Sequence, residues 1–457
     1  MRRLLPIAAA AALLVALTAL AAPAAARIEV APARGFAPHQ LVVKLEGEAV
    51  GHRLALPAGT GVRESAAALR RNPRVEYAVP NYIATASATP ESFEVPDDPG
   101  TLDGASEAAL SAGDWSFKQW NFLNWEGTPT PNLPISPGGI DAVDAWRHLA
   151  EVGRTGAEGV TVAVLDTGIA YRSDGTGFLR SPDFGSGQFT RGYDFVDRDQ
   201  IPLDENGHGT HVAGTIGEKT DNGVALTGLA YRAKLMPVRV LDEHGRGDAA
   251  TIAKGIRFAT AHGAQVINMS FNFGCHKKVP IVDEALREAY AHGVVTVASA
   301  GNIGSETCVS EPATGPRVIA VGGTTEGGCL GDYSLAGTAI DVVAPGGGLP
   351  ISGCPSVSAR PIYQVTLRPG STSTFAIPSN YVGTSMAAAH VSGVAAMVLA
   401  SGVLGKQPSP KMRVQAVTRR LRSTARSLGL PPTQQGAGLI DAGRATEFIP
   451  DSLRASK

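Results

Sequence analysis

The feature that most constrains this chain is a long apolar run near its C-terminal end. Between Met386 and Leu399 there is no Asp, Glu, Lys or Arg, and alanine is the commonest residue. Such a composition predicts an α-helix. Because a helix that is apolar on every side has to be surrounded by other elements, the run predicts a large core around it. The 457 residues, 44% of them hydrophobic, suffice for that core and one small additional module.

The residues before this helix alternate between predicted strands and predicted helices. Residues 160–165 form a continuous apolar run that is typical of a strand buried on both faces. Further strands are predicted at 234–241, 266–270, 294–298, 318–321 and 340–343, with helices at 140–149, 249–261 and 281–292. The alternation predicts an α/β fold with a mostly parallel central sheet and helices on both of its faces.

Three polar residues follow predicted strands closely. Asp166 ends the first buried strand, and Ser270 and Asn302 each lie just past a later one. Ligands of open parallel sheets bind at the carboxyl ends of the strands. We therefore expect these three residues to lie near the functional site.

The first 26 residues carry the pattern of a secretory signal peptide. Arg2 and Arg3 form a basic start, residues 4–20 are apolar, and Ala24–Ala26 supply small residues for cleavage. The alternative is a permanent membrane anchor, but no charged residue follows the apolar segment directly. The chain is therefore expected to be secreted, either outside the cell or into a periplasm.

Residues 37–85 predict a small α+β module ahead of the main domain. Its elements are a strand at 39–46, an amphipathic helix at 62–71 and a second strand at 75–82. From residue 83 to residue 113 the composition changes to Ser, Thr, Pro, Asp, Glu and Gly without periodicity. This is typical of a linker, and an exposed linker is where proteolysis would cut the chain.

Charge and cysteine content narrow the classes of partner and compartment. Lys and Arg total 40 against 41 Asp and Glu, so nothing favours nucleic acid or stable membrane association, and we expect a monomer. The four cysteines, at 275, 308, 329 and 354, suit an oxidising compartment and match no zinc signature. Three disulfide pairings are possible, and proximity in sequence favours Cys275–Cys308 and Cys329–Cys354.

Three residues in distinctive surroundings have the chemistry of a hydrolase. Asp166 lies in VAVLDTGI, His208 in NGHGTHVAG and Ser385 in GTSMA, at the start of the apolar helix. Amide hydrolysis at neutral pH needs a nucleophile, a base with a pKa near 7 and a carboxylate that orients the base. Near the beginning of a helix, Ser385 would also lie beside unpaired N–H groups that stabilise an oxyanion.

Each of these residues has a simpler interpretation when taken alone. Ser385 could be a helix cap, Asp166 a turn residue, and His208 a loop residue or, with His211, part of a metal site. Zinc bound by two histidines would need a third ligand, and no such ligand lies at helical spacing. Only the presence of all three favours catalysis.

The three motifs, in the chain order Asp, His, Ser, resemble those of the subtilisin family of serine proteases. The serine motif is not Gly-x-Ser-x-Gly, which counts against an esterase of the α/β-hydrolase type. The resemblance covers about residues 115–445, and residues 436–442 resemble the family's closing segment. It implies a subtilisin-like fold and a serine endopeptidase that needs no cofactor for catalysis. Ser385 would be the nucleophile, His208 the general base and then acid, and Asp166 the residue that orients the base.

The same resemblance implies the residues that surround the substrate. Asn302 would donate to the oxyanion together with the backbone N–H of Ser385. One wall of the primary pocket would consist of Ser270, Phe271 and Asn272, and the other of Ser299, Ala300 and Gly301. The edge that pairs with the substrate backbone would consist of Gly245, Arg246 and Gly247. The sequence departs from the family at Asn272, where glycine is usual, and in a longer loop at 355–381. Glu311 is expected near the pocket.

Structural calcium and a propeptide are further implications of the resemblance. Asp194, Asp197 and Asp199 resemble a calcium loop of thermitase-like members, and residues 220–223 resemble a second one; a solvated acidic turn is the alternative. Residues 27–97 would be an inhibitory propeptide with the start of the linker, and 98–457 the catalytic domain. Cleavage is expected between residues 84 and 113. The alternative is an N-terminal domain that stays attached.

The sequence therefore predicts a secreted, calcium-stabilised serine endopeptidase that acts on proteins and peptides and is inhibited by its own propeptide until cleavage. Three alternatives stay open. The chain could be a secreted binding protein that keeps the fold without catalysis, or an esterase or peptidyl transferase on the same triad. It could also be a metalloenzyme that uses His208 and His211.

Overall fold

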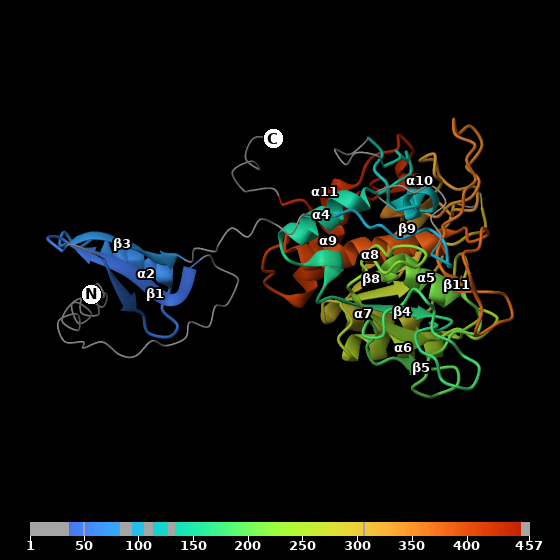
Figure 1. Ribbon diagram of the computed structural model, residues 1–457, viewed down its shortest axis with the longest axis horizontal. Helices are drawn as coiled ribbons and strands as arrows, with labels where there is room; N and C mark the ends of the chain where they lie inside the picture. The colour runs from blue at the N-terminus through green and yellow to red at the C-terminus, as the bar shows by residue number, and fades with distance from the viewer. Residues whose placement is uncertain are drawn as a thin grey trace. The chain divides into compact units, whose positions relative to one another are not determined.

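A computed structural model describes residues 36–48, 51–82, 94–104, 113–126, 133–304 and 307–448 of the chain. The predicted signal peptide, residues 1–26, lies outside these ranges. The chain divides into two compact units, residues 1–89 and residues 90–457, which are described separately (Figure 1).

The first unit contains a three-stranded antiparallel sheet and one helix. Its elements are β1 (Phe36–Leu45), β2 (His52–Ala55), α2 (Val62–Leu69) and β3 (Val75–Tyr82), with strand order β2-β1-β3. Val62, Ala66 and Leu69 form the buried face of α2, in one hydrophobic cluster with Leu41 and Val43 of β1. The predicted strand, helix and strand are all present. The sequence missed β2 because this four-residue strand is almost entirely exposed and shows no alternation.

The second unit is built on a seven-stranded sheet in which every neighbouring pair is parallel. The strand order is β10-β9-β8-β7-β4-β6-β5. The strands are β4 (Thr161–Asp166), β5 (Tyr193–Asp194), β6 (Lys234–Arg239), β7 (Val266–Met269), β8 (Val295–Ser299), β9 (Val318–Thr324) and β10 (Val342–Pro345). All residues of β7, β8, β9 and β10 are buried, so this part of the sheet is covered on both faces. The predicted α/β fold is confirmed.

Helices flank this sheet (Figure 1). They are α3 (Trp115–Lys118), η2 (Trp120–Phe122), α4 (Ala142–Glu151), η3 (Thr155–Ala157), α5 (His208–Gly217), α6 (Ala249–Ala261), α7 (Pro280–Ala291), α8 (Thr384–Ser401), α9 (Pro410–Thr424), α10 (Pro432–Gln435) and α11 (Ala442–Thr446). A short hairpin of β11 (Thr366–Leu367) and β12 (Phe375–Ala376) precedes α8. The sequence missed α9 because arginines dominate it, although Val414, Val417 and Leu421 form a buried stripe at helical spacing.

The apolar run forms the central helix, as predicted. Helix α8 packs against β7–β10 and against α5, and all of its residues except Leu399 and Ala400 are buried. Among the described residues, α8 alone has the length and composition that could cross a membrane, but 89% of that window is buried inside the unit. Its apolar surface is therefore used by the core.

Part of the predicted linker packs against the second unit. The Pro96 carbonyl accepts a hydrogen bond from the indole of Trp115 (2.7 Å), and the Gly100 N–H donates to the Ala225 carbonyl (2.7 Å). The carboxylate of Asp98, which is fully buried, accepts from the backbone N–H groups of Asp221 and Asn222 (both 3.1 Å). These contacts are made by backbone groups and single polar side chains, so they leave no periodic pattern of hydrophobic residues in the sequence. Composition alone therefore does not distinguish residues 94–104 from a linker.

Two disulfides join the pairs that proximity favours, Cys275–Cys308 and Cys329–Cys354, with Cα–Cα distances of 5.9 and 6.1 Å. Among the described residues there is no free cysteine.

Candidate active site

Asp166 and His208 meet at the carboxyl end of the sheet. Asp166 is the last residue of β4 and is fully buried, and His208 is the first residue of α5. His208 Nδ1 lies 2.7 Å from Asp166 Oδ1. Because a carboxylate only accepts hydrogen bonds, the proton lies on Nδ1 and leaves Nε2 as the basic nitrogen. The pair has the geometry of a base and the residue that orients it.

The electrostatics of the pair suit a base. Burial by itself lowers the pKa of His208, but the negative charge of Asp166 and the hydrogen bond to it raise the pKa by more, so the pKa lies above its usual value. The His208 side chain keeps 26% of its surface exposed, which leaves a path for a reacting group.

Ser385 lies in the first turn of α8, next to the helix that begins at His208 (Figure 1). Its Oγ donates to the Ser270 carbonyl (3.0 Å), and the Ser270 Oγ donates to the Ser385 carbonyl (2.8 Å). Among the hydrogen bonds of the described residues, none joins Ser385 Oγ to His208. Contacts of this kind are often loose without substrate, and rotation about one bond would redirect the hydroxyl.

Asn302 lies beside this serine with its amide group oriented. Its Oδ1 accepts from the Thr384 N–H (2.8 Å) and from the Thr384 Oγ1 (2.7 Å). The oxygen is thereby fixed on the side of Thr384, so the Nδ2 hydrogens are left for another acceptor. A helix N-terminus also leaves backbone N–H groups free, so two kinds of donor can serve one oxyanion.

One residue that organises the site escaped the sequence analysis. Both oxygens of Asp204 are used: Oδ1 accepts from the Gly207 N–H (2.9 Å) and from Thr167 Oγ1 (2.9 Å), and Oδ2 accepts from the Thr210 N–H (2.9 Å). Asp204 thus connects the residue after Asp166 to both sides of His208. Its signal is the Asp-x-Asn-Gly turn pattern that precedes the histidine motif.

His211 does not act as a partner of His208 in a metal site. Its Nε2 lies 3.1 Å from the Ile362 carbonyl, to which it donates. Burial lowers the pKa of His211 to about 3, so the ring is neutral. Among the described residues, no group of three or more His, Cys, Asp or Glu is placed to hold a metal ion.

The sequence profile of the Subtilase family matches residues 157–438, a region that contains Asp166, His208, Asn302 and Ser385. This chain is a subtilase. A thermophilic serine proteinase of Bacillus sp. (strain AK1) is 34% identical over 73% of this chain and 66% of its own length. Thermitase of Thermoactinomyces vulgaris is 33% identical over 70% of this chain and all of its own length. The protein is accordingly a subtilisin-type serine endopeptidase.

Solved structures agree with this assignment. A protease of Pseudoalteromonas arctica PAMC 21717 superimposes with a TM-score of 0.59 at 28% identity, covering 77% of this chain and 98% of its own. A cold-adapted subtilisin-like serine proteinase gives a TM-score of 0.51 at 27% identity, covering 71% of this chain and 97% of its own.

The predicted substrate walls of the subtilase lie side by side. Ser270–Asn272 follows β7, and Ser299–Gly301 begins with the last residue of the neighbouring strand β8. The Ser299 Oγ donates to the Phe271 carbonyl (3.4 Å). Ser310 connects to the second wall through its N–H, which donates to the Ala300 carbonyl (3.0 Å), and its Oγ is buried without a partner. Glu311 is buried and pairs with Lys278 (3.2 Å).

Gly245–Gly247 lies between β6 and α6. The Asp242 Oδ1 accepts from the Arg246 N–H (2.8 Å), and the Asn206 side chain donates to the Glu243 carbonyl (2.8 Å). The second bond connects this loop to the turn before His208. Among the described residues, no β-bridge involves residues 245–247, so their role in binding substrate stays a prediction.

In the first predicted calcium loop of the subtilase, an arginine side chain already pairs with the carboxylates. Arg239, buried at the end of β6, pairs with Asp194 (3.0 Å), Asp197 (2.8 Å) and Glu205 (2.7 Å). Asp199 accepts from the Ile201 N–H (2.7 Å). The sequence analysis counted the three carboxylates but not the arginine, which is distant in sequence.

In the second predicted calcium loop, no arginine of the described residues pairs with the carboxyl groups as Arg239 does in the first loop. The Asn222 side chain donates to the buried Asp183 (2.8 Å), and the Asp98 carboxylate caps the same loop. Burial raises the pKa of Asp98 to about 7 and that of Asp183 well above its usual value, and the Asp98 carboxyl adds to the rise at Asp183. Asp98, Asp183 and Asn222 are residues with oxygen donors of the kind that a hard cation prefers.

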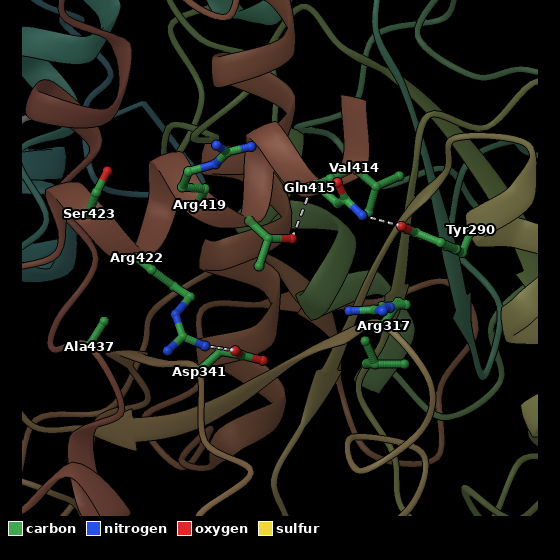
Figure 2. Close-up of a pocket in the computed structure, with 11 residues that line it drawn as sticks. Tyr290, Arg317, Asp341, Val414, Gln415, Arg419, Arg422, Ser423 and Ala437 are labelled. Carbon is green, nitrogen blue, oxygen red and sulfur yellow. Dashed lines mark hydrogen bonds and ion pairs between the residues drawn. The ribbon is translucent and has the colours of Figure 1, made fainter. Parts of the chain in front are cut away.

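A prominent hollow of the subtilase lies away from these residues. It has a volume of about 690 Å³ and is lined by Arg317, Arg419 and Arg422 together with Asp341 and Tyr290 (Figure 2). Val318 and Asp341 lie at the amino ends of β9 and β10, whereas Asn302 follows the carboxyl end of β8. The hollow is therefore at the opposite edge of the sheet from Ser385.

Proposed function

We propose that Asp166, His208 and Ser385 form the catalytic triad of a secreted endopeptidase that is made with an inhibitory propeptide. The observation that carries the proposal is the hydrogen bond of 2.7 Å between His208 Nδ1 and Asp166, which leaves a basic nitrogen on the helix beside Ser385. Three groups with these roles are what acyl transfer from a peptide requires.

In the acylation step, Ser385 Oγ turns from the Ser270 carbonyl toward His208 Nε2, which takes its proton. Oγ then attacks the scissile carbonyl, and the carbonyl oxygen gains the negative charge. His208, now protonated and stabilised by Asp166, gives the proton to the leaving amine as the C–N bond breaks. Water repeats the sequence on the acyl-enzyme and regenerates Ser385.

The oxyanion is held by Asn302 Nδ2 and the Ser385 N–H. The anchoring of Asn302 Oδ1 by Thr384 supports this role, because a donor that is fixed beforehand does not need to reorganise during the reaction. Thr384 therefore acts on catalysis through Asn302.

Removal of residues 27 to about 93 would complete the enzyme. Residues 94–104 hold Trp115 and the 221–222 loop, so a cut before Glu94 would leave these contacts in the mature unit. The predicted cleavage range of 84–113 narrows to the segment before residue 94. The signal-like N-terminus and the two disulfides support secretion.

Calcium is proposed as a structural ion held by Asp98, Asp183 and Asn222. It would neutralise carboxylates that the protein itself leaves uncompensated, and it would stabilise the folded state by mass action. It takes no part in bond cleavage.

The test is the intact mass and casein hydrolysis of secreted wild type and Ser385→Ala, expressed side by side. We expect the wild type to lose its N-terminal module, to hydrolyse casein and to be inactivated by a serine-directed reagent. Ser385→Ala should keep the module and have no activity, while its far-UV circular dichroism stays that of a folded protein. Casein hydrolysis by Ser385→Ala would overturn the triad assignment. Loss of the module from both proteins would overturn self-processing alone.

A further inference from the structure

The segment between β10 and α8 contains a strap, residues 362–367, that lies along the helix of the catalytic base. Ile362, Gln364, Val365 and Thr366 are fully buried, and Leu367 is 3% exposed. The Ile362 N–H donates to the Tyr381 carbonyl (3.0 Å), and Tyr381 comes four residues before Ser385. One continuous stretch of chain, residues 362–385, therefore runs from the strap to the nucleophile.

The strap contacts α5 at its beginning, middle and end. Thr366 Oγ1 donates to the Gly207 carbonyl, His211 Nε2 donates to the Ile362 carbonyl (3.1 Å), and the Val365 N–H donates to Glu218 Oε1 (2.9 Å). Glu218 follows the last residue of α5, and its side chain folds back toward Gly214. The strap thus spans the helix whose first residue is His208.

The contact at Gly207 is the one closest to the chemistry. The Gly207 carbonyl belongs to the peptide bond that joins Gly207 to His208. The hydrogen bond from Thr366 therefore fixes the orientation of the peptide group that precedes the His208 Cα. Gly207 has φ +101°, and a Cβ there would lie 3.2 Å from Thr366 Oγ1 and 3.3 Å from Tyr381 Oη. The strap and Tyr381 therefore pack against the backbone at this position, which any displacement of the strap would disturb.

A ring stack joins the two catalytic elements in the same place. The rings of His211 and Tyr381 lie 4.0 Å apart at an angle of 6°. His211 belongs to α5, and Tyr381 leads into α8. The stack and the Ile362–Tyr381 bond fix the helix of His208 and the approach to Ser385 to each other independently of the central sheet.

Glu218 anchors the far end of the strap without needing a charge. It is fully buried, its Oε1 accepts one backbone N–H, and its Oε2 has no partner. Burial, followed by the nearby Asp183 carboxyl, raises the pKa of Glu218 well above its usual value. Its role is that of a neutral acceptor, which glutamine can reproduce and methionine cannot.

We propose that the strap is a positioning element for catalysis, in which Thr366 and Glu218 act through α5 to hold His208 at its working distance from Ser385. The inference rests on the proposed triad. Substrate walls are built from other segments, so loss of the strap contacts lowers kcat and leaves KM nearly unchanged. A displacement of about 1 Å can cost on the order of 100-fold in rate, so we expect losses of roughly 10- to 100-fold.

The test compares Thr366→Val, which keeps the shape and removes the donor, with Thr366→Ser, which keeps the hydroxyl. We expect kcat for a peptide substrate to fall by roughly 10- to 100-fold in Thr366→Val and to stay within about threefold of wild type in Thr366→Ser. Reaction of Ser385 with an organofluorophosphorus reagent, which needs the base, should slow in parallel. A kcat of Thr366→Val equal to that of wild type would overturn the proposal.

Thr372→Val is the matched control. Thr372 Oγ1 donates to the Gly177 carbonyl (3.0 Å) at the exposed tip of the β11–β12 hairpin, so this variant loses a similar bond away from α5. Its kcat should not change, and an equal loss in both valine variants would assign the effect to the hairpin in general and contradict positioning. If Thr366→Val does not fold, Glu218→Met and Glu218→Gln decide, with reduced kcat expected only for methionine. Ser385→Ala is measured in the same assay to test the two proposals separately. Activity retained by Ser385→Ala would contradict the proposed triad, whereas an inactive Ser385→Ala together with a fully active Thr366→Val would contradict the role of the strap alone.

Discussion

Polar residues of different kinds lie at the two edges of the seven-stranded sheet that are formed by the ends of its strands: the carboxyl edge, where the strands end, and the amino edge, where they begin. At the carboxyl edge, Asp166 Oδ1 is bonded to His208 Nδ1 while its Oδ2 has no hydrogen-bond partner among the described residues, and Asn302 Oδ1 is fixed by Thr384. At the amino edge, Asp341 is paired with Arg422 (2.5 Å) and accepts from the Ala320 N–H (3.0 Å) beside an open hollow (Figure 2). The volume of a hollow therefore does not indicate where the candidate active site lies in this protein. The better indication is a set of polar groups that are fixed in direction and still have unused hydrogen-bonding capacity.

The comparison predicts that variants at the carboxyl edge alter rate, with the largest effect at Asp166. Asp166→Asn keeps the shape, but asparagine can donate to His208 Nδ1 and so favours the wrong tautomer. We expect kcat to fall on the order of 10⁴-fold. Loss of the carboxylate also removes the interactions that raise the pKa of His208. Because the base acts when neutral, the acidic limb of kcat/KM rises through a pKa above 6.5 in wild type and should move to lower pH in the variant.

Asn302→Ala should show the next largest effect. The variant removes one oxyanion donor but leaves the triad intact, so kcat should fall by about 10²–10³-fold with little change in KM, a magnitude that comes from a subtilisin. Steady-state kinetics on a short peptide ester and amide would measure it. A large rise in KM with constant kcat would place Asn302 in ground-state binding instead.

The third prediction concerns the second predicted calcium loop, residues 220–223, whose Thr220 and Asp221 line the same hollow as the first residues of β4 and β6, Thr161 and Lys234. Added calcium should raise the unfolding midpoint of the catalytic unit in Ser385→Ala, which keeps its N-terminal module, and a 100-fold excess over Kd corresponds to about 3 kcal/mol. Asp98→Asn should reduce this increment, whereas Asp199→Asn, in the loop that Arg239 serves, is the matched control. Loss of the increment in Asp199→Asn alone would place the ion in the first loop and contradict this prediction.

The smallest effect is expected at the hollow itself. Arg422→Met removes the partner of Asp341, but the arginine is half exposed, so solvent screens the pair. We expect a loss of about 0.5 kcal/mol in the free energy of unfolding and no change in kcat. A changed kcat would break the contrast between the two edges.

The sequence was sufficient to single out the candidate catalytic residues, because each lies in a local pattern. Asp166 ends an apolar strand, His208 follows a glycine turn and Ser385 opens an apolar helix, and parallel strands bring such ends together.

The residues that hold this chemistry in place could not be predicted in the same way. Thr366 reaches Gly207 across 159 positions and Arg239 reaches Asp194 across 45, and neither contact leaves a period or motif in the chain. A hydrogen bond between distant segments is a property of the packed fold, so only the structure supplies it.

The Cys275–Cys308 bridge has a consequence for how the enzyme selects substrates. It joins the segment after the first predicted substrate wall to the segment that contains Ser310, and the stretch between the two cysteines includes α7 and β8. The bridge therefore limits how far the segments next to the two predicted substrate walls can separate. We expect the selectivity of the enzyme to depend on the side chains of these walls, and to change by substitution of those side chains and not by insertion of residues between the two cysteines.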